Sequence, residues 1–364
     1  MAKRVGVDKW LFGVVLLLML FGLVMVFSAS AVMAKERFGS PYTFMMKQAL
    51  WGLLGMVALV VLMQFDYRRY NNPRVVFPIV AVTTLLLLGV FLLHDSHNTH
   101  RWIRFGGFFT FQPSEIAKPV LVLFLAWFLQ TRIQMMEDWR NTVLPAAAPS
   151  LLFIALIVKE PDLGTALVCA AVTALMLYLA GAQVRYFAIA AACAAPVLYF
   201  LLFHVAWRRA RMIAFINPDA DPKGTGFHIL QSLIAVGTGG ITGLGLMEGR
   251  QKLFYLPEPH TDFIFANVCE ELGLIGAIAT VVLFAVLGYR GLRAAILSTD
   301  PFARFLAFGI TVTILIQAFF NISVVLALLP TKGIPLPFIS SGGTSLFITL
   351  ASMGVLLNIT REID

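Results

Sequence analysis

Long apolar segments, separated by shorter polar stretches, recur along the whole chain. Ten of them approach the roughly 20 residues that a helix needs to cross a bilayer, at residues 10–33, 45–65, 75–93, 115–131, 143–158, 163–180, 185–206, 264–288, 303–328 and 342–360. We therefore expect an all-α, polytopic integral membrane protein with ten transmembrane helices in one domain, residues 1–364. The first run exceeds the apolar core of a signal peptide, about 7 to 15 residues, and is expected to be retained.

One polar segment, residues 207–262 between the seventh and eighth apolar runs, is much longer than the others. A structureless connection of that length is unusual unless it is functional. Residues 228–236 within it have the pattern of an amphipathic helix that lies at the membrane interface. The Pro-flanked Asp219 and Asp221 are typical of a turn. The glycine-rich stretch 237–249 fits tight packing and a phosphate cradle equally well.

Composition agrees with this pattern and narrows the function. The chain is 59% hydrophobic and 13% charged, against about a quarter charged in soluble domains. Its net charge is +8, but the cations are dispersed among the apolar runs, which favours an anionic lipid or a phosphate-bearing substrate and argues against nucleic acid. Three separated cysteines in apolar runs indicate neither a disulfide framework nor a metal site.

The distribution of Lys and Arg predicts the orientation. With ten crossings both termini lie on one side, and 13 of the 27 cations fall there. Six of the other 14 belong to the long segment, where the positive-inside bias is weakest. Short loops therefore place both termini in the cytoplasm and residues 207–262 outside, as a large extracytoplasmic loop.

Two polar clusters on the predicted outer side lie in the first half of the chain. The first joins Arg101 to Glu115 and Lys118 at the start of the fourth span. Glu115 and Lys118 are i,i+3 neighbours on a helix, so a purely structural pair between them is equally consistent with the spacing. The second, residues 159–162, is more typical of a solvated hairpin, with Asp162 placed to cap the sixth span.

Two further clusters lie in the second half. Glu258, His260, Thr261 and Asp262 precede the eighth span, and two more glutamates, at 270 and 271, lie one to two turns inside it. Ionisable groups there are costly unless they face a cavity, so at least one glutamate should face one. Thr261 or Asp262 as a simple helix cap is the alternative.

The fourth cluster, residues 329–343, contains Lys332 and Ser340 between prolines that forbid regular helix. Irregular backbone at membrane depth is tolerated only where protein or water covers it, which predicts a re-entrant segment lining a cavity. Carboxylates, cations and an imidazole on one membrane face suit phosphate chemistry. A carboxylate whose pKa is raised by an apolar wall takes a proton from a hydroxyl while cations neutralise a diphosphate.

These clusters resemble the SEDS family (shape, elongation, division and sporulation), bacterial membrane enzymes that polymerise cell-wall glycan from lipid II. The resemblance spans nearly the whole chain and rests on the stretches 101–103, 112–118, 160–165, 231–240, 256–265, 270–273 and 329–340. Residues 249–256 and 330–332 are more similar to the division member than to the elongation member.

The resemblance implies a septal peptidoglycan glycosyltransferase of the bacterial cytoplasmic membrane that uses lipid II with inversion and releases a polyprenyl diphosphate. Asp262 matches the family's essential aspartate and is the expected catalytic residue, as general base or by orienting the acceptor, with Arg101 and Lys118 on the diphosphate. The expected substrate-binding residues are Arg101, Glu115, Lys118, Glu258, His260, Thr261, Lys332 and Ser340.

The resemblance also implies partners: a class B penicillin-binding protein, which is a transpeptidase, and other division proteins. A divalent cation (Mg or Mn) assisting at the diphosphate is compatible with this chemistry, although no ligand set is legible. Two alternatives stay open. A lipid II flippase fits the spans and charges, but no internal repeat supports alternating access. A pure scaffold would not need the clustered charges.

Overall fold

The computed structural model describes residues 6–92, 101–105, 109–253 and 255–362. Its α-helices are α1 (Lys9–Phe38), α2 (Thr43–Gln64), α3 (Pro73–Gly89), α4 (Pro113–Gln130), α5 (Leu144–Lys159), α6 (Leu163–Leu179), α7 (Val184–Phe203), α8 (Ala206–Ile216), α9 (Phe227–Gly239), α10 (Ile264–Leu297), α11 (Pro301–Val325) and α12 (Gly343–Thr360). Short helical turns occupy Tyr67–Tyr70, Val90–Leu92, Ile133–Met135, Trp139–Val143 and Pro218–Ala220. Strands β1 (Ile103–Phe105) and β2 (Phe109–Phe111) form an antiparallel hairpin.

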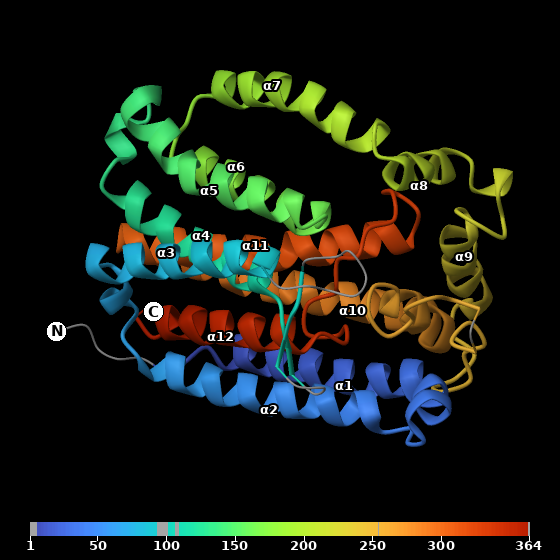
Figure 1. The fold of residues 1–364 in the computed structure, drawn as a ribbon. Helices are drawn as coiled ribbons and strands as arrows, with labels where there is room; N and C mark the ends of the chain where they lie inside the picture. The colour runs from blue at the N-terminus through green and yellow to red at the C-terminus, as the bar shows by residue number, and fades with distance from the viewer. Residues whose placement is uncertain (1–5, 93–100, 106–108, 254, 363–364) are drawn as a thin grey trace.

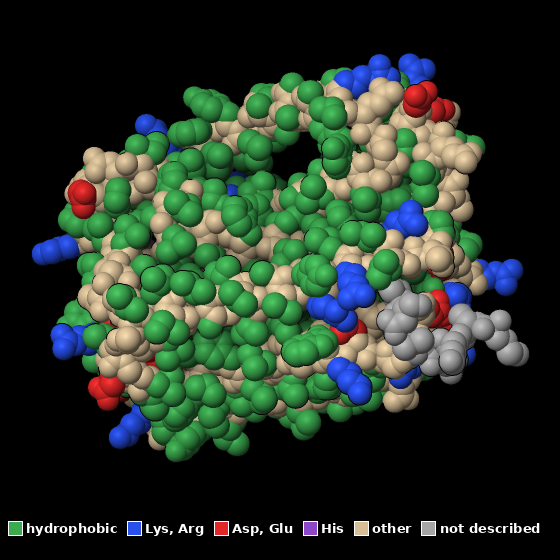
Figure 2. Space-filling model, turned by 180° about the vertical axis from the view of Figure 1, so that it is seen from behind, with side chains coloured by type: hydrophobic (Ala, Val, Ile, Leu, Met, Phe, Trp, Pro, Cys, Tyr) green, Lys and Arg blue, Asp and Glu red, His purple; other side chains and the backbone are tan. Residues whose placement is uncertain are grey.

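The predicted helical membrane protein is confirmed, and a helix covers each of the ten predicted spans. Eight helices in the described part of the chain are long and apolar enough to cross a membrane. The other two predicted spans correspond to α4, with 18 residues, and α6, with 17. Ten crossings therefore remain a prediction. Figure 2 shows a broad band of hydrophobic side chains between two ends where charged side chains gather, as a bilayer requires.

Close approach between apolar helices is achieved through small residues. Along the contact between α2 and α12, a Cβ on Gly55 would lie 2.6 Å from Leu350 Cδ1, and one on Gly354 would lie 2.5 Å from the Leu59 carbonyl oxygen. Lipid supplies no hydrophobic drive between membrane helices, so van der Waals contact at such positions stabilises the bundle. The contacts of α1 with α2 and α10, and of α11 with α4 and α10, complete it.

Helix α7 departs from this close packing. None of its side chains is buried, and Figure 1 shows it standing apart from α5 and α6. Figure 2, seen from behind, shows an opening beneath it. Helices α8 and α9 follow at the end of the molecule opposite both chain termini. The helix predicted at 228–236 is present as α9, which packs against α10.

Candidate active site

The segment that carries Asp262 is held by its backbone from several directions. Asn321 of α11 donates from Nδ2 to the Asp262 carbonyl oxygen at 2.8 Å, and Asn267 of α10 donates to Pro259 O at 2.7 Å. Ser340 Oγ donates to Thr261 O at 2.6 Å. The residue that caps α10 is Phe263, without a side-chain bond. Neither Thr261 nor Asp262 therefore caps the helix, and the Asp262 carboxylate is available for other contacts.

Asp262 lines a cavity of about 630 Å³ together with Arg101 and Lys332. The cavity lies between the turn at residues 161–164, the end of α7, the start of α8 and the irregular segment 330–333. A Cβ on Gly333 would lie 2.8 Å from Asp262 Oδ2, so this segment lies directly against the carboxylate. Three residues that are far apart in the sequence, two cations and one acid, thus share one hollow.

Arg101 is fixed by the turn that follows α5. Its Nε donates to Glu160 O at 3.0 Å and its Nη2 donates to Pro161 O. Asp162 caps α6, as predicted, because it accepts from Thr165 N at 3.1 Å. Asp162 also lines the cavity. The turn at residues 161–164 is therefore part of the site wall, which the hairpin interpretation of 159–162 did not anticipate.

The irregular segment before α12 is stabilised by side-chain amides. Gln317 donates to Pro335 O at 3.0 Å, and Asn321 donates to Ile334 O at 2.7 Å. Ser340 Oγ accepts from Leu336 N at 2.7 Å. The carbonyl groups of Ile334 and Pro335 in this irregular segment are thereby hydrogen-bonded inside the protein. Non-helical backbone at membrane depth requires such partners. The expectation of an irregular segment that lines a cavity agrees with this arrangement, since residues 330–333 form one wall.

Two arginines of α8 complete the wall, although neither is among the predicted site residues. Arg208 and Arg211 line the cavity, and both guanidinium groups lie about 5 Å from the centre of the Trp207 ring, at 5.0 and 5.1 Å. The run Trp207-Arg-Arg-Ala-Arg211 contributes three of the six cations of the long segment. Helical spacing puts residues three apart on one face, which was the signal available for finding the pair.

Burial and charge shift the titration of the two central groups. Burial raises the pKa of Asp262 to about 7, with Glu258 and Asp162 adding to the shift and Arg101 and Arg211 opposing it. Burial also lowers the pKa of Lys332 to about 8, and the neighbouring Arg208 lowers it further. The pKa of Asp262 thus lies near neutral pH, which is the most effective range for a general base that works at that pH.

The structure does not bring Glu115 and Lys118 to this cavity. Lys118 Nζ lies 2.9 Å from Glu115 Oε2 and donates to Gln317 Oε1 at 2.7 Å, with both charged side chains buried. The i,i+3 spacing on α4 makes this pair, which is the structural alternative. The predicted diphosphate role required Lys118 to lie beside Arg101 in the cavity, and Lys118 does not line it.

The remaining predicted residues have positions around the site. Glu258 is exposed. His260 is buried, with its ring 4.5 Å from that of Phe44, and burial lowers its pKa. Thr261 and Ser340 are joined through the backbone contact described above. None of these four lines the cavity.

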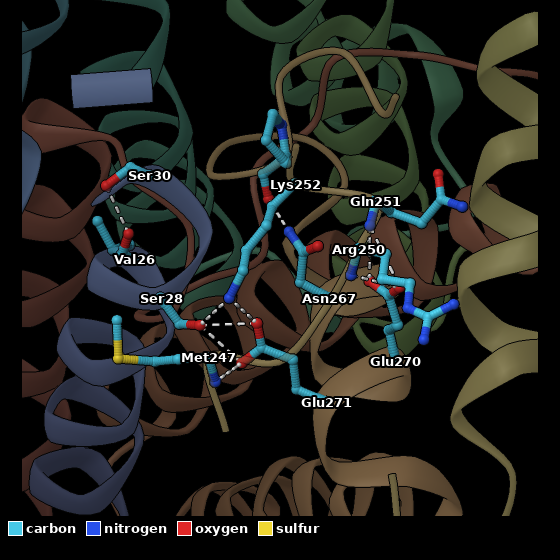
Figure 3. Close-up of polar contacts among 11 residues, drawn as sticks. Val26, Ser28, Ser30, Met247, Arg250, Gln251, Lys252, Asn267, Glu270 and Glu271 are labelled. Atoms are coloured by element: carbon cyan, nitrogen blue, oxygen red, sulfur yellow. Dashed lines mark hydrogen bonds and ion pairs between the residues drawn. The ribbon is translucent and has the colours of Figure 1, made fainter. Parts of the chain in front are cut away.

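Glu270 and Glu271 face protein and not a cavity, contrary to expectation. Figure 3 shows them turned toward the loop between α9 and α10, in a group that we call the loop anchor: Ser28, Lys252, Glu270 and Glu271. Glu271 lies 2.7 Å from Lys252 Nζ and accepts from Ser28 Oγ at 2.7 Å. Glu270 accepts from the backbone N–H of residues 250 and 251. These partners satisfy the two buried carboxylates.

The glycine-rich stretch serves close packing. A Cβ on Gly243 would lie 2.1 Å from the Glu271 carbonyl oxygen, and one on Gly239 would lie 1.9 Å from Cys269 O. Both glycines thus lie against the backbone of α10, which itself bends at Gly273. Asp221 accepts from Thr225 N at 2.8 Å, which confirms the turn predicted there.

In the described residues, no group of three or more His, Cys, Asp or Glu side chains is placed to hold a metal ion. The protein's own donors therefore do not form a metal site there, and the arginines and Lys332 are the cavity's positive charges.

Comparison with known proteins adds the family. Residues 8–364 match the family model of the cell cycle proteins FtsW, RodA and SpoVE. A probable peptidoglycan glycosyltransferase FtsW of Geobacter metallireducens is 46% identical over 345 residues, covering 94% of this chain and 91% of the relative. Stage V sporulation protein E of Bacillus subtilis is 39% identical, covering 99% and 98%.

Solved structures agree. A chain from a study of the structural coordination of polymerization and crosslinking by a peptidoglycan synthase complex superposes with a TM-score of 0.79 at 25% identity, covering 98% of this chain and 97% of that one. The rod shape determining protein RodA of Thermus thermophilus gives 0.71 at 25% identity, covering 98% of each chain. The chain belongs to the FtsW, RodA and SpoVE family, that is, to the SEDS family, and resembles its FtsW members.

Proposed function

We propose that this protein is a peptidoglycan glycosyltransferase that polymerises glycan strands from lipid II during septal cell-wall synthesis. The observation that carries the proposal is the cavity in which Asp262 lies with Arg101, Lys332 and the arginines of α8. The names of the FtsW relatives support the enzyme class. A carboxylate with a raised pKa in a cavity with four cations is the arrangement that transfer from a diphosphate needs.

In the proposed reaction, Asp262 takes the proton of the acceptor sugar's hydroxyl as its oxygen attacks the anomeric carbon. The bond between that carbon and the diphosphate oxygen breaks, and the polyprenyl diphosphate leaves with the electron pair. Arg208, Arg211 and Lys332 stabilise the charge that develops on this leaving group. Arg101 stays on the cavity wall through its carbonyl contacts. The three residues that stabilise the leaving group take the diphosphate role that was predicted for Lys118, because Lys118 is paired with Glu115.

Orientation and partner belong to the same proposal. Both termini are assigned to the cytoplasm and the cavity to the outer side, supported by the positive-inside bias. A class B penicillin-binding protein is the proposed partner, supported by the structural likeness to a chain studied in a peptidoglycan synthase complex. A divalent cation bound by the substrate's phosphates is compatible with the proposal, but the cavity cations supply the stabilisation in it.

The test is polymerisation of lipid II by the purified protein with its transpeptidase partner, read as glycan length on a gel. Asp262→Asn is expected to lower the rate by about 10²- to 10⁴-fold, the usual contribution of a general base. Asp219→Asn, an exposed aspartate of the same long segment, is the matched control and should retain full activity. Undiminished polymerisation by Asp262→Asn would remove Asp262 from the mechanism. Transport of lipid II across vesicles without any polymer would instead support the flippase alternative.

A further inference from the structure

A second cavity, of about 420 Å³, lies at the end of the molecule where both chain termini are found (Figure 1). It is formed by the segment before α1, the last turns of α10 and the end of α12, and its lining residues include Asp8, Lys9, Trp10, Arg290, Arg293 and Leu297. Asp262 precedes α10, whereas Leu297 is its last residue. The two cavities therefore lie at opposite ends of one long helix, and this one is separate from the candidate active site.

Positive charge dominates this second cavity. Its lining has three cations, at 9, 290 and 293, and one carboxylate, that of Asp8. Asp8 is fully engaged: Arg290 holds its Oδ2 at 2.6 and 2.7 Å, while Oδ1 accepts from the backbone N–H of residues 10 and 11. Lys9 and Arg293 are exposed and have no ion-pair partner in the described part of the chain. Two positive charges thus remain for a ligand.

Apolar surface adjoins these cations. Trp10 is 73% exposed, and Ile296 and Leu297 at the end of α10 are 75% and 47% exposed. An exposed tryptophan beside Lys and Arg at the end of a membrane helix is typical of the headgroup level of a bilayer. A small soluble anion would make no apolar contact with this surface, whereas the acyl chains of a phospholipid can pack against it.

We propose that this cavity binds the headgroup of an anionic phospholipid of the phosphatidylglycerol class. Its phosphate lies between Lys9 and Arg293, and its acyl chains run beside Trp10 and Leu297. The same end of the molecule carries Arg68 and Arg69 in the turn after α2 and Arg361 after α12. By the positive-inside bias, these arginines assign the cavity to the cytoplasmic leaflet. Basic pockets between membrane helices on that side suit such headgroups.

The experiment is native mass spectrometry of the full-length protein from nanodiscs that contain equal amounts of phosphatidylglycerol and phosphatidylcholine with palmitoyl and oleoyl chains. The native protein should retain one phosphatidylglycerol in preference to phosphatidylcholine. The double variant Lys9→Gln, Arg293→Gln should bind it about 25-fold more weakly, from about fivefold for each cation. Both side chains are exposed, so folding is preserved, which an unchanged melting temperature checks.

Arg74→Gln is the matched control, since it removes one exposed cation from the start of α3 at the same end but outside the cavity. It should retain the lipid as the native protein does. Equal retention by the double variant and the native protein would overturn the proposal. Displacement of the lipid by millimolar glycerol phosphate would show a site for free phosphate instead. Binding of a soluble glutamate decapeptide in place of the lipid would show a site for an acidic protein segment.

Discussion

Three lysine residues of the predicted outer clusters have different surroundings. Lys118 is buried against Glu115 and Gln317. Lys159 is exposed, with its ammonium 5.1 Å from the centre of the Phe91 ring. Lys332 is half-buried in the cavity that contains Asp262. The same side-chain type therefore has a structural, a surface and a proposed substrate-binding role, and burial with partners distinguishes them.

Removal of Lys118 and of Lys332 should have different consequences. Lys118→Met leaves the Glu115 carboxylate buried without its partner, which should lower the free energy of unfolding by about 3 to 5 kcal/mol. Adding Glu115→Gln removes that charge and should restore much of the loss. Lys332→Gln should leave the melting temperature nearly unchanged and lower the polymerisation rate. Thermal unfolding and the lipid II assay on the same samples check this, and a stable, inactive Lys118→Met, Glu115→Gln protein would return the diphosphate role to Lys118.

The pKa values of Asp262 and Lys332 predict a narrow pH range for activity. Asp262 must be ionised to take a proton, so kcat/KM should rise with pH up to about 7. Lys332 must be charged to stabilise the diphosphate, so kcat/KM should fall above about pH 8. Lys332→Arg keeps a charge at all these pH values and should abolish the alkaline fall while the acid side stays. An unchanged alkaline fall in that variant would assign it to another group.

At the scale of elements, the loop anchor connects α1, α10 and the loop that leads to Asp262. Lys252 Nζ contacts both Ser28 of α1 and Glu271 of α10, and Met247 N donates to Glu271 at 3.0 Å. Figure 3 shows how these groups converge from separate segments. Among the described residues, Lys252 is the cation that pairs with the buried Glu271 carboxylate, so it adds an ion pair to the backbone hydrogen bonds that hold the loop.

Lys252→Met should therefore destabilise the protein by about 3 to 5 kcal/mol, the usual cost of leaving a buried charge without its partner. The double variant Lys252→Met, Glu271→Gln should recover part of this stability. Glu248→Gln, an exposed side chain of the same loop, is the control and should melt like the native protein. Equal melting temperatures for Lys252→Met and the control would contradict the anchoring role.

Glycine at 243 is required by both its conformation and its surroundings. Its φ is +80°, and an added Cβ would overlap the carbonyl oxygen of Glu271. Gly243→Ala should lower the melting temperature and polymerisation activity together, since the loop has to move away from α10. Gly237→Ala, inside α9 with open space around it, should be neutral or stabilising by up to about 1 kcal/mol. Similar melting curves for the two variants would exclude tight packing as the reason for Gly243.

The whole molecule places two charged ends on either side of an apolar band (Figure 2). Membrane-impermeant maleimide tests the proposed orientation in a Cys193→Ser background, because Cys193 is the exposed native cysteine. Glu248→Cys, near the candidate active site end, should be labelled in spheroplasts, whereas Arg74→Cys, near the termini, should react only after permeabilisation. The reverse pattern would place the cavity in the cytoplasm.

The sequence by itself determined the helical membrane class, the positions of the apolar helices, the cap at Asp162 and the family, because each depends on local composition, spacing or ordered motifs. It also selected Asp262, Arg101 and Lys332, which the structure brings into one cavity. Only the tertiary structure decided that Lys118 pairs with Glu115, that Glu270 and Glu271 fasten a loop, and that α8 contributes Arg208 and Arg211. The i,i+3 spacing allowed the pair of Lys118 and Glu115 without excluding a diphosphate role for Lys118. Contacts between distant segments depend on which of them fold side by side, and spacing along the chain carries no information about that.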